Sequence, residues 1–142
     1  VADNIADDYG EIESRKKRFE QFENNFNQKN FDDPIIKNMW DLINEFNISL
    51  KIIYDLFDGI RSDIKNRVKL NSKKDLLLYS YRVAGTVGLM MAKILNVKNK
   101  TALKSAIDLG IAMQLTNISR DVIEDKKNNR FYISADFESI KD

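Results

Sequence analysis

The sequence predicts an all-α domain, and three observations support this prediction. One Pro and five Gly in 142 residues are few, so long uninterrupted helices can form. Apolar residues recur every three or four positions along most of the chain, which is the spacing of an amphipathic helix. No strand-like alternation, internal repeat or low-complexity tract is evident in the sequence.

The first half of the chain contains three predicted helices. Residues 1–27 form a long polar helix with one apolar stripe, made of Ile5, Ile12, Phe19, Phe22 and Phe26. Pro34 suits the first turn of the next helix, which is predicted for residues 35–46. A short break then separates this helix from a third one at residues 49–64.

Two further long helices are predicted after a short connection. Ser72 is the expected N-cap of a helix over residues 73–96. Thr101 is expected to cap a fifth helix that continues to Asp125. Ser134 then opens a short last helix near the end of the chain.

The composition excludes several kinds of chemistry. The chain has no Cys and no His, so disulfides, thiolate metal sites and histidine bases are all excluded. Catalysis would have to use carboxylates, Tyr, Lys, Arg and a bound metal. The net charge of +1 gives no argument for a nucleic-acid partner, and we expect none. No apolar stretch reaches the length of a membrane span.

The fifth helix carries the strongest functional signal. One face of it reads, in order, Leu103, Ile107, Gly110, Gln114, Asn117, Asp121 and Asp125. The first half of this stripe is apolar, whereas the second half consists of two amides and two carboxylates. Burying such groups is costly without partners. Two explanations are open: the helix emerges into water near its end, or these side chains face a shared cavity.

A second pair of carboxylates, Asp3 and Asp7, has the same four-residue spacing as Asp121 and Asp125. Two acidic side chains one helical turn apart repel each other unless a cation lies between them. Mg²⁺ suits such a site because it prefers carboxylate oxygens and leaves room for phosphates. Periodicity alone, however, predicts that Asp3 and Asp7 face solvent, opposite the apolar stripe of their helix. The two pairs together suggest a metal–diphosphate site clamped from two helices.

The fourth helix contains Gly85 and Gly88, which each cost on the order of 1 kcal/mol relative to Ala. One interpretation is that they allow close helix packing, and the other is that they leave space for an apolar ligand. The spacing does not decide between the two. Tyr79 and Tyr81 of the same helix are, from the pattern alone, ordinary half-buried aromatic residues.

Three segments, residues 79–91, 109–125 and 130–133, resemble the squalene/phytoene synthase family, and most closely its bacterial phytoene synthases. Residues 57–63 are similar to the stretch that precedes them in the family. The opening residues 3–7 match the first aspartate-rich motif. Because several independent motifs occur in the right order, the resemblance is specific and runs from the first residues to about residue 133.

The resemblance implies an isoprenoid-synthase-type helical bundle with a central cavity between two aspartate-bearing helices. Family members are prenyltransferases that join two isoprenoid diphosphates head to head through a cyclopropyl diphosphate. They use Mg²⁺, and Mn²⁺ is a second candidate. The resemblance favours conversion of geranylgeranyl diphosphate to phytoene in carotenoid biosynthesis, without NADPH. Two alternatives are squalene or dehydrosqualene formation from farnesyl diphosphate, and a non-catalytic helical relative that acts as an assembly or binding factor.

Carried over to matching positions, the resemblance also implies residue roles. The implied metal ligands are Asp3, Asp7, Asn117, Asp121 and Asp125. Gln114 would line the substrate site beside Asn117, which would help to bind metal or diphosphate. Arg120 and Arg130 would lie near the diphosphate. Tyr79 would lie by the reacting carbons and, with Asp121 and Asp125, form the catalytic set. The prenyl-chain pocket would be lined by Ala84, Val87 and Gly88.

Two departures from the family pattern shape further expectations. Asn4 stands where the family often has a second adjacent Asp, which would weaken one metal contact. Family chains are also much longer, so we expect residues 1–142 to be one partial prenyl synthase domain, truncated at both ends and inactive alone. We expect a cytoplasmic protein, and peripheral membrane association is an open option because its substrates are lipophilic.

Overall fold

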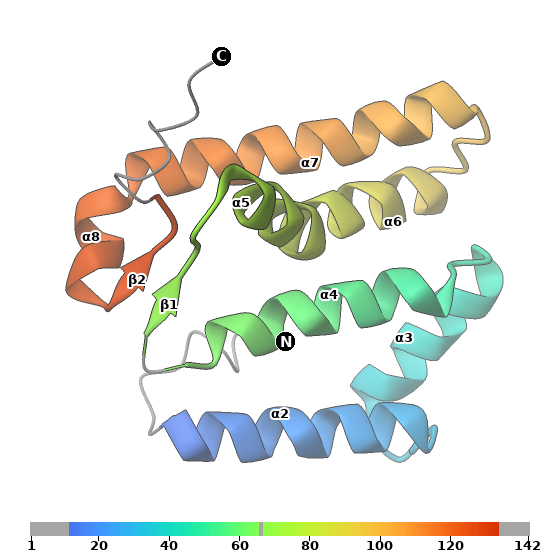
Figure 1. Cartoon of the computed structure of the whole chain (residues 1–142). Coiled ribbons are helices and arrows are strands. Elements are labelled where there is room, and N and C mark those ends of the chain that lie inside the picture. Colours follow the sequence, from blue (N-terminus) through green and yellow to red (C-terminus); the bar gives the residue numbers. More distant parts are fainter. Residues whose placement is uncertain (1–11, 66, 134–142) are drawn as a thin grey trace.

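The computed structural model describes residues 12–65 and 67–133, and helices dominate this part of the chain, which confirms the all-α class (Figure 1). Helix α2 (Ile12–Asn27) buries the predicted stripe through Phe19, Phe22 and Phe26. The predictions for Asp3, Asp7 and a helix from Ser134 lie outside the described residues.

Helices α3 (Pro34–Glu45) and α4 (Leu50–Asp63) begin close to where the sequence predicts. Pro34 occupies the first helical position of α3, as expected. The Asp33 side chain caps this helix because its Oδ1 accepts a hydrogen bond from the Ile35 N–H at 2.8 Å. The apolar faces of α2, α3 and α4 meet in one core, whose largest fully buried side chains include Phe19, Phe26 and Phe57.

The helix predicted over residues 73–96 is confirmed as one continuous helical segment, but it contains a wide turn that the pattern did not predict. The segment consists of α5 (Lys73–Ser80), the π-helical turn η1 (Tyr81–Gly85) and α6 (Thr86–Ile94). Ser72 is the N-cap as predicted, and its Oγ accepts a hydrogen bond from the Asp75 N–H at 3.1 Å. In the wide turn the Thr86 N–H reaches the carbonyl of Tyr81, five residues earlier.

The fifth helix also differs from its prediction at both ends. Helix α7 (Lys100–Arg120) is capped by Asn99 and not by Thr101. The Asn99 side-chain oxygen accepts hydrogen bonds from the N–H groups of Thr101 at 2.8 Å and Ala102 at 3.1 Å. At its other end, α7 stops at Arg120, and a separate short helix α8 (Val122–Lys127) continues beyond the non-helical residue Asp121.

Two short strands, which the sequence analysis did not anticipate, close the fold. Strands β1 (Val68–Lys69) and β2 (Arg130–Phe131) pair in parallel, with Val68 opposite Arg130. Strands of two residues are too short to show alternation, so no sequence pattern predicts them. Their pairing holds the chain after α8 beside the chain that follows α4.

The elements stack in layers, with α4 between α2 and the α5–η1–α6 segment, and α7 on the far side of that segment (Figure 1). A second, smaller hydrophobic cluster lies where β1, β2, α5 and α7 meet, and it consists of Val68, Tyr79, Ile118 and Tyr132. Ile118 places this cluster at the polar end of α7. In the described part of the chain, no helix combines the length and the apolar character that a membrane span needs.

Candidate functional site

A cavity of about 230 Å³ lies at the polar end of α7. Its lining combines carboxylates, amides, phenols and one guanidinium with two apolar side chains, and it consists of Asp63, Tyr79, Val83, Gln114, Asn117, Ile118, Asp121, Asp125, Arg130 and Tyr132. These residues come from α4, α5, η1, α7, α8 and the chain around β2. Tertiary packing therefore gathers them from much of the described chain.

The polar stripe of the fifth helix faces this cavity. Gln114, Asn117, Asp121 and Asp125 all contribute to its lining, while Gly110, earlier on the same stripe, is buried. Of the two explanations for the stripe, the shared cavity therefore describes the structure better than a helix that merely emerges into water. Asp121 and Asp125 stay one helical turn apart in spite of the break at Asp121, because the Asp125 N–H still donates a hydrogen bond to the Asp121 carbonyl at 2.8 Å.

The two carboxylates of the second pair lie in different electrostatic environments. Arg120 holds Asp121 with a two-pronged ion pair, in which Nε and Nη2 each donate to one carboxylate oxygen at 2.7 Å. This contact lowers the pKa of Asp121. Burial raises the pKa of Asp125. The positive charge of Arg130 lowers this pKa, and the carboxylates of Asp121 and Glu124 raise it further. In this pair the Asp121 anion is thus stabilised by Arg120, whereas the Asp125 anion is less stabilised.

Tyr79 and Tyr132 form a stacked pair at the cavity, with ring centroids 4.9 Å apart. Both phenols donate to one carboxylate: Tyr79 to Asp63 Oδ2 at 2.7 Å, and Tyr132 to Asp63 Oδ1 at 3.0 Å. Burial, followed by the charge of Asp63, raises the pKa of both hydroxyl groups well above the ordinary value of tyrosine. Both side chains are therefore neutral phenols at every physiological pH.

Asp63 and Tyr132 line the site but are not among the residues predicted from the sequence, although both belong to segments that resemble the family. One local signal was available for Asp63. It is the last residue of α4, where the negative end of the helix dipole disfavours a carboxylate. No local signal marks Tyr132, because its partners lie 53 and 69 residues away in the sequence.

Other predicted residues lie outside the cavity lining. Arg120 contacts Asp121 from the exposed side of the helix end. Gly88 packs against α7, since a Cβ on it would lie 2.2 Å from the Ala106 carbonyl oxygen. Ala84 packs there too, because a Cβ added to Gly110 would lie 2.4 Å from the Ala84 carbonyl oxygen. Val87, in contrast, is exposed. Close helix packing thus explains the glycines, and a prenyl pocket at Ala84, Val87 and Gly88 stays a prediction.

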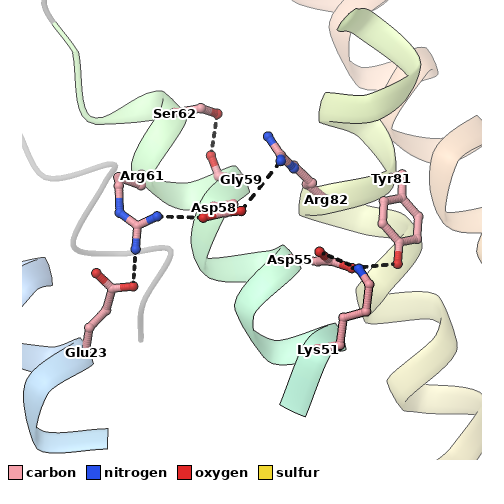
Figure 2. A network of polar contacts seen from close by, with 9 residues as sticks. All are labelled: Glu23, Lys51, Asp55, Asp58, Gly59, Arg61, Ser62, Tyr81 and Arg82. Atoms are coloured by element: carbon pink, nitrogen blue, oxygen red, sulfur yellow. Dashed lines mark hydrogen bonds and ion pairs between the residues drawn. The ribbon is translucent and has the colours of Figure 1, made fainter. Parts of the chain in front are cut away.

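A separate polar network ties η1 to α4 and α4 to α2 (Figure 2). Arg61 pairs with Glu23 of α2 and, at 2.6 Å, with Asp58. Arg82 of η1 approaches the same Asp58 at 3.5 Å. One turn earlier on α4, Asp55 accepts hydrogen bonds from Lys51 and from the Tyr81 hydroxyl, as Figure 2 also shows. These contacts anchor the π-helical turn, which begins two residues after Tyr79.

The donor set of the cavity suits a hard divalent cation. Asn117, Asp121 and Asp125 offer amide and carboxylate oxygens, which Mg²⁺ and Mn²⁺ accept. Within residues 12–65 and 67–133, no three acidic side chains gather closely enough to hold a metal ion by themselves. A bound ion would therefore need further oxygens from outside this group.

Comparison with known proteins gives a match to the squalene/phytoene synthase family model over residues 1–138. The chain belongs to the squalene/phytoene synthase family. This membership confirms the resemblance found in the sequence. No solved structure gives a significant match to the chain.

Several curated members of the squalene/phytoene synthase family are similar to the chain. A 15-cis-phytoene synthase from Paracoccus sp. is 46% identical over 83 residues, which are 58% of this chain and 27% of that protein. A phytoene synthase from Pseudescherichia vulneris is 41% identical over 63% of this chain and 29% of its own length. The chloroplastic phytoene synthase 1 of Zea mays is 38% identical over 68% of this chain and 25% of its own. The matched segments thus span little more than a quarter of these relatives.

Proposed function

We propose that the full-length protein is a Mg²⁺-dependent prenyltransferase that condenses two molecules of geranylgeranyl diphosphate head to head into phytoene, through a cyclopropyl diphosphate. The observation that carries this proposal is the shared cavity of Gln114, Asn117, Asp121 and Asp125, with Tyr79 and Arg130 beside them. Relatives named phytoene synthase support the substrate and product.

The residues of the cavity suit the ionisation of an allylic diphosphate. Asn117, Asp121 and Asp125 would hold the metal through their oxygens, and Arg130 would bind the diphosphate. When bound, Mg²⁺ would supply the positive charge that stabilises the diphosphate as it leaves. As the carbon–oxygen bond breaks, its electron pair leaves with the diphosphate, and an allylic cation forms beside Tyr79.

An apolar surface suits the prenyl chains. Val87 and Met91 of α6 and the following residue Leu95 recur every four residues, and Leu109 and Met113 do so on α7. All five are exposed in the described part of the chain. Exposed apolar side chains that gather in one patch commonly mark a binding or packing surface. We propose that it faces the hydrocarbon tails of the substrates.

Product analysis of the full-length protein tests this function. We expect a C40 hydrocarbon from geranylgeranyl diphosphate and Mg²⁺ without NADPH, identified by mass spectrometry. Asp121→Ala and Asp125→Ala should each lower kcat by at least about a hundredfold, because the stabilisation of developing negative charge is lost. Asp108→Ala is the control, since this carboxylate is exposed on helix α7 and does not line the cavity.

Other outcomes would replace the proposal. A C30 hydrocarbon from farnesyl diphosphate would move the function to squalene or dehydrosqualene synthesis, with the same metal site. If folded protein released no diphosphate from either substrate, the non-catalytic relative would be favoured. A loss of activity in Asp108→Ala as large as that in Asp121→Ala would show that the metal site had been assigned wrongly.

A further inference from the structure

Asp63, Tyr79 and Tyr132 form a hydrogen-bonded triad in the wall of the cavity. The two phenol oxygens lie 3.3 Å apart, and each also lies within hydrogen-bond distance of a different oxygen of Asp63. The triad joins the end of α4 to α5 and to the chain after β2, across sequence separations of 16 and 69 residues. Both tyrosines are nearly inaccessible to solvent, with exposed fractions of 6% and 5%.

Counting the hydrogens fixes the orientation of both hydroxyl groups. Each phenol carries one hydrogen, and an ionised carboxylate only accepts. The contacts with Asp63 at 2.7 and 3.0 Å are the shortest that the two hydroxyls make with each other or with Asp63, so they take both hydrogens. No hydrogen is left for the contact between the two phenol oxygens. Each oxygen therefore presents lone pairs, and no O–H, to its other neighbours in the cavity.

This orientation matters for a reaction that forms a carbocation. An O–H group directed at a cation is repulsive, whereas oxygen lone pairs and the faces of stacked aromatic rings attract it. A wall that repels the cation would hold it less firmly against the rings, and a cation that moves away from the rings can be captured by water. A wall with both hydrogens turned away avoids this repulsion.

We infer that Asp63 is a positioning residue for the reaction. It turns the hydroxyl hydrogens of Tyr79 and Tyr132 away from the allylic cation, so that the cation reacts to form hydrocarbon and not alcohol. This inference rests on the proposed function. Asp63 acts through the two phenols and takes no part in breaking the carbon–oxygen bond. Substitution of Asp63 should therefore change the products formed from the cation while leaving the rate of diphosphate release almost unchanged.

The test uses the full-length protein with Asp63→Asn, which keeps the side-chain size. An Asn oxygen can accept from one phenol, but its NH₂ group cannot accept from the other. One hydroxyl hydrogen becomes free to turn toward the cation, which is then repelled from the wall and can be captured by water. Attack of water on the cation forms a carbon–oxygen bond, and its proton passes to the solvent, which yields a prenyl alcohol.

Two quantities are measured with geranylgeranyl diphosphate and Mg²⁺: the rate of diphosphate release and the ratio of alcohol to hydrocarbon. For Asp63→Asn we expect a release rate within about threefold of wild type and a ratio raised about tenfold, the size expected when one charge-assisted hydrogen bond is lost. Asp108→Asn is the control, since Asp108 is exposed on α7 and does not line the cavity. Its ratio should equal that of wild type.

Tyr132→Phe is the second variant, in case Asp63→Asn does not fold. It removes the hydroxyl that shares Asp63 with Tyr79, and it should lower the ratio or leave it unchanged, since it frees no hydrogen. A ratio unchanged in folded Asp63→Asn overturns the inference, as does a raised ratio in Tyr132→Phe. A wild-type protein that releases no diphosphate rejects the proposed function and the inference with it, whereas an active wild type with an unchanged ratio in Asp63→Asn rejects the inference alone.

Discussion

At the scale of single residues, two fully buried hydroxyl groups of the π-helical region have opposite environments. Thr86 Oγ1 donates to the Arg82 carbonyl at 2.8 Å, which satisfies its hydrogen. Ser80 Oγ has no hydrogen-bond partner among the described residues, although Ser80 is fully buried. A buried polar group without a partner costs roughly 1–3 kcal/mol. Ser80 is therefore a point at which the native packing loses stability.

Substitution of these two residues tests this difference. Ser80→Ala removes an unsatisfied hydroxyl and should raise the free energy of unfolding by about 1 kcal/mol. Thr86→Val removes a satisfied one and should lower it by a similar amount. Urea unfolding followed by circular dichroism measures both. Equal destabilisation by the two variants would show that Ser80 Oγ has a partner in solution.

At the scale of elements, α6 and η1 cross α7 at close range. Two glycines make this approach possible: a Cβ on Gly88 or on Gly110 would lie 2.2 or 2.4 Å from a carbonyl oxygen of the opposite segment. These oxygens belong to Ala106 and Ala84, so the obstacle is backbone that cannot rotate away. The crossing sets how far the polar end of α7 lies from Tyr79, and hence the size of the cavity.

Gly88→Ala should therefore destabilise the protein, in spite of the better helix propensity of Ala. We expect the free energy of unfolding to fall by about 1–3 kcal/mol, the usual cost of overpacking. Ser105→Ala, on the exposed face of α7, is the control and should be neutral or slightly stabilising. The measurement is the urea midpoint of each variant. A Gly88→Ala variant as stable as wild type would mean that the two helices are further apart than described.

The π-helical turn η1 explains why sequence spacing could not decide the role of the glycines. A wide turn holds one residue more than an α-helical turn, so faces counted through it shift by about 100°. Tyr79 lies before the turn and Gly88 after it. Regular α-helical spacing across residues 73–96 therefore misplaces the face that carries Tyr79 relative to the face that carries Gly88.

At the scale of the whole molecule, α4 is the central element of the described chain. One side of it packs on α2 and α3, and another contacts η1 and α6. Phe57 lies in this core, with its ring 5.8, 5.8 and 5.3 Å from the rings of Phe19, Phe22 and Phe26. The same helix ends in Asp63, so the core fixes one wall of the cavity.

Phe57→Ala should accordingly lower the free energy of unfolding by about 3–5 kcal/mol. This is a large fraction of the roughly 5–15 kcal/mol typical of a domain. Leu77→Ala, at an exposed position of α5, should change it by less than about 0.5 kcal/mol. Thermal unfolding followed by circular dichroism compares the two. Similar midpoints for both variants would contradict a core centred on Phe57.

The sequence by itself determined what depends on near neighbours. The buried stripe of α2, Pro34 at the start of α3, the Ser72 cap and the line of amides and carboxylates from Gln114 to Asp125 all follow from spacings of one to four residues. The motifs in residues 79–91, 109–125 and 130–133 also indicated the family. Helix propensity, capping and periodicity are local properties, and a single sequence contains them in full.

Only the tertiary structure decided which distant residues meet. The pairing of β1 with β2, the approach of Gly88 to Ala106 and the meeting of Asp63 with Tyr132 join segments far apart in the chain. No local pattern encodes such contacts, because their free energy comes from packing and shared burial and not from the propensity of either segment. The candidate metal oxygens and Tyr79 could thus be found from the sequence, whereas the meeting of Tyr79 with Asp63 and Tyr132 could not.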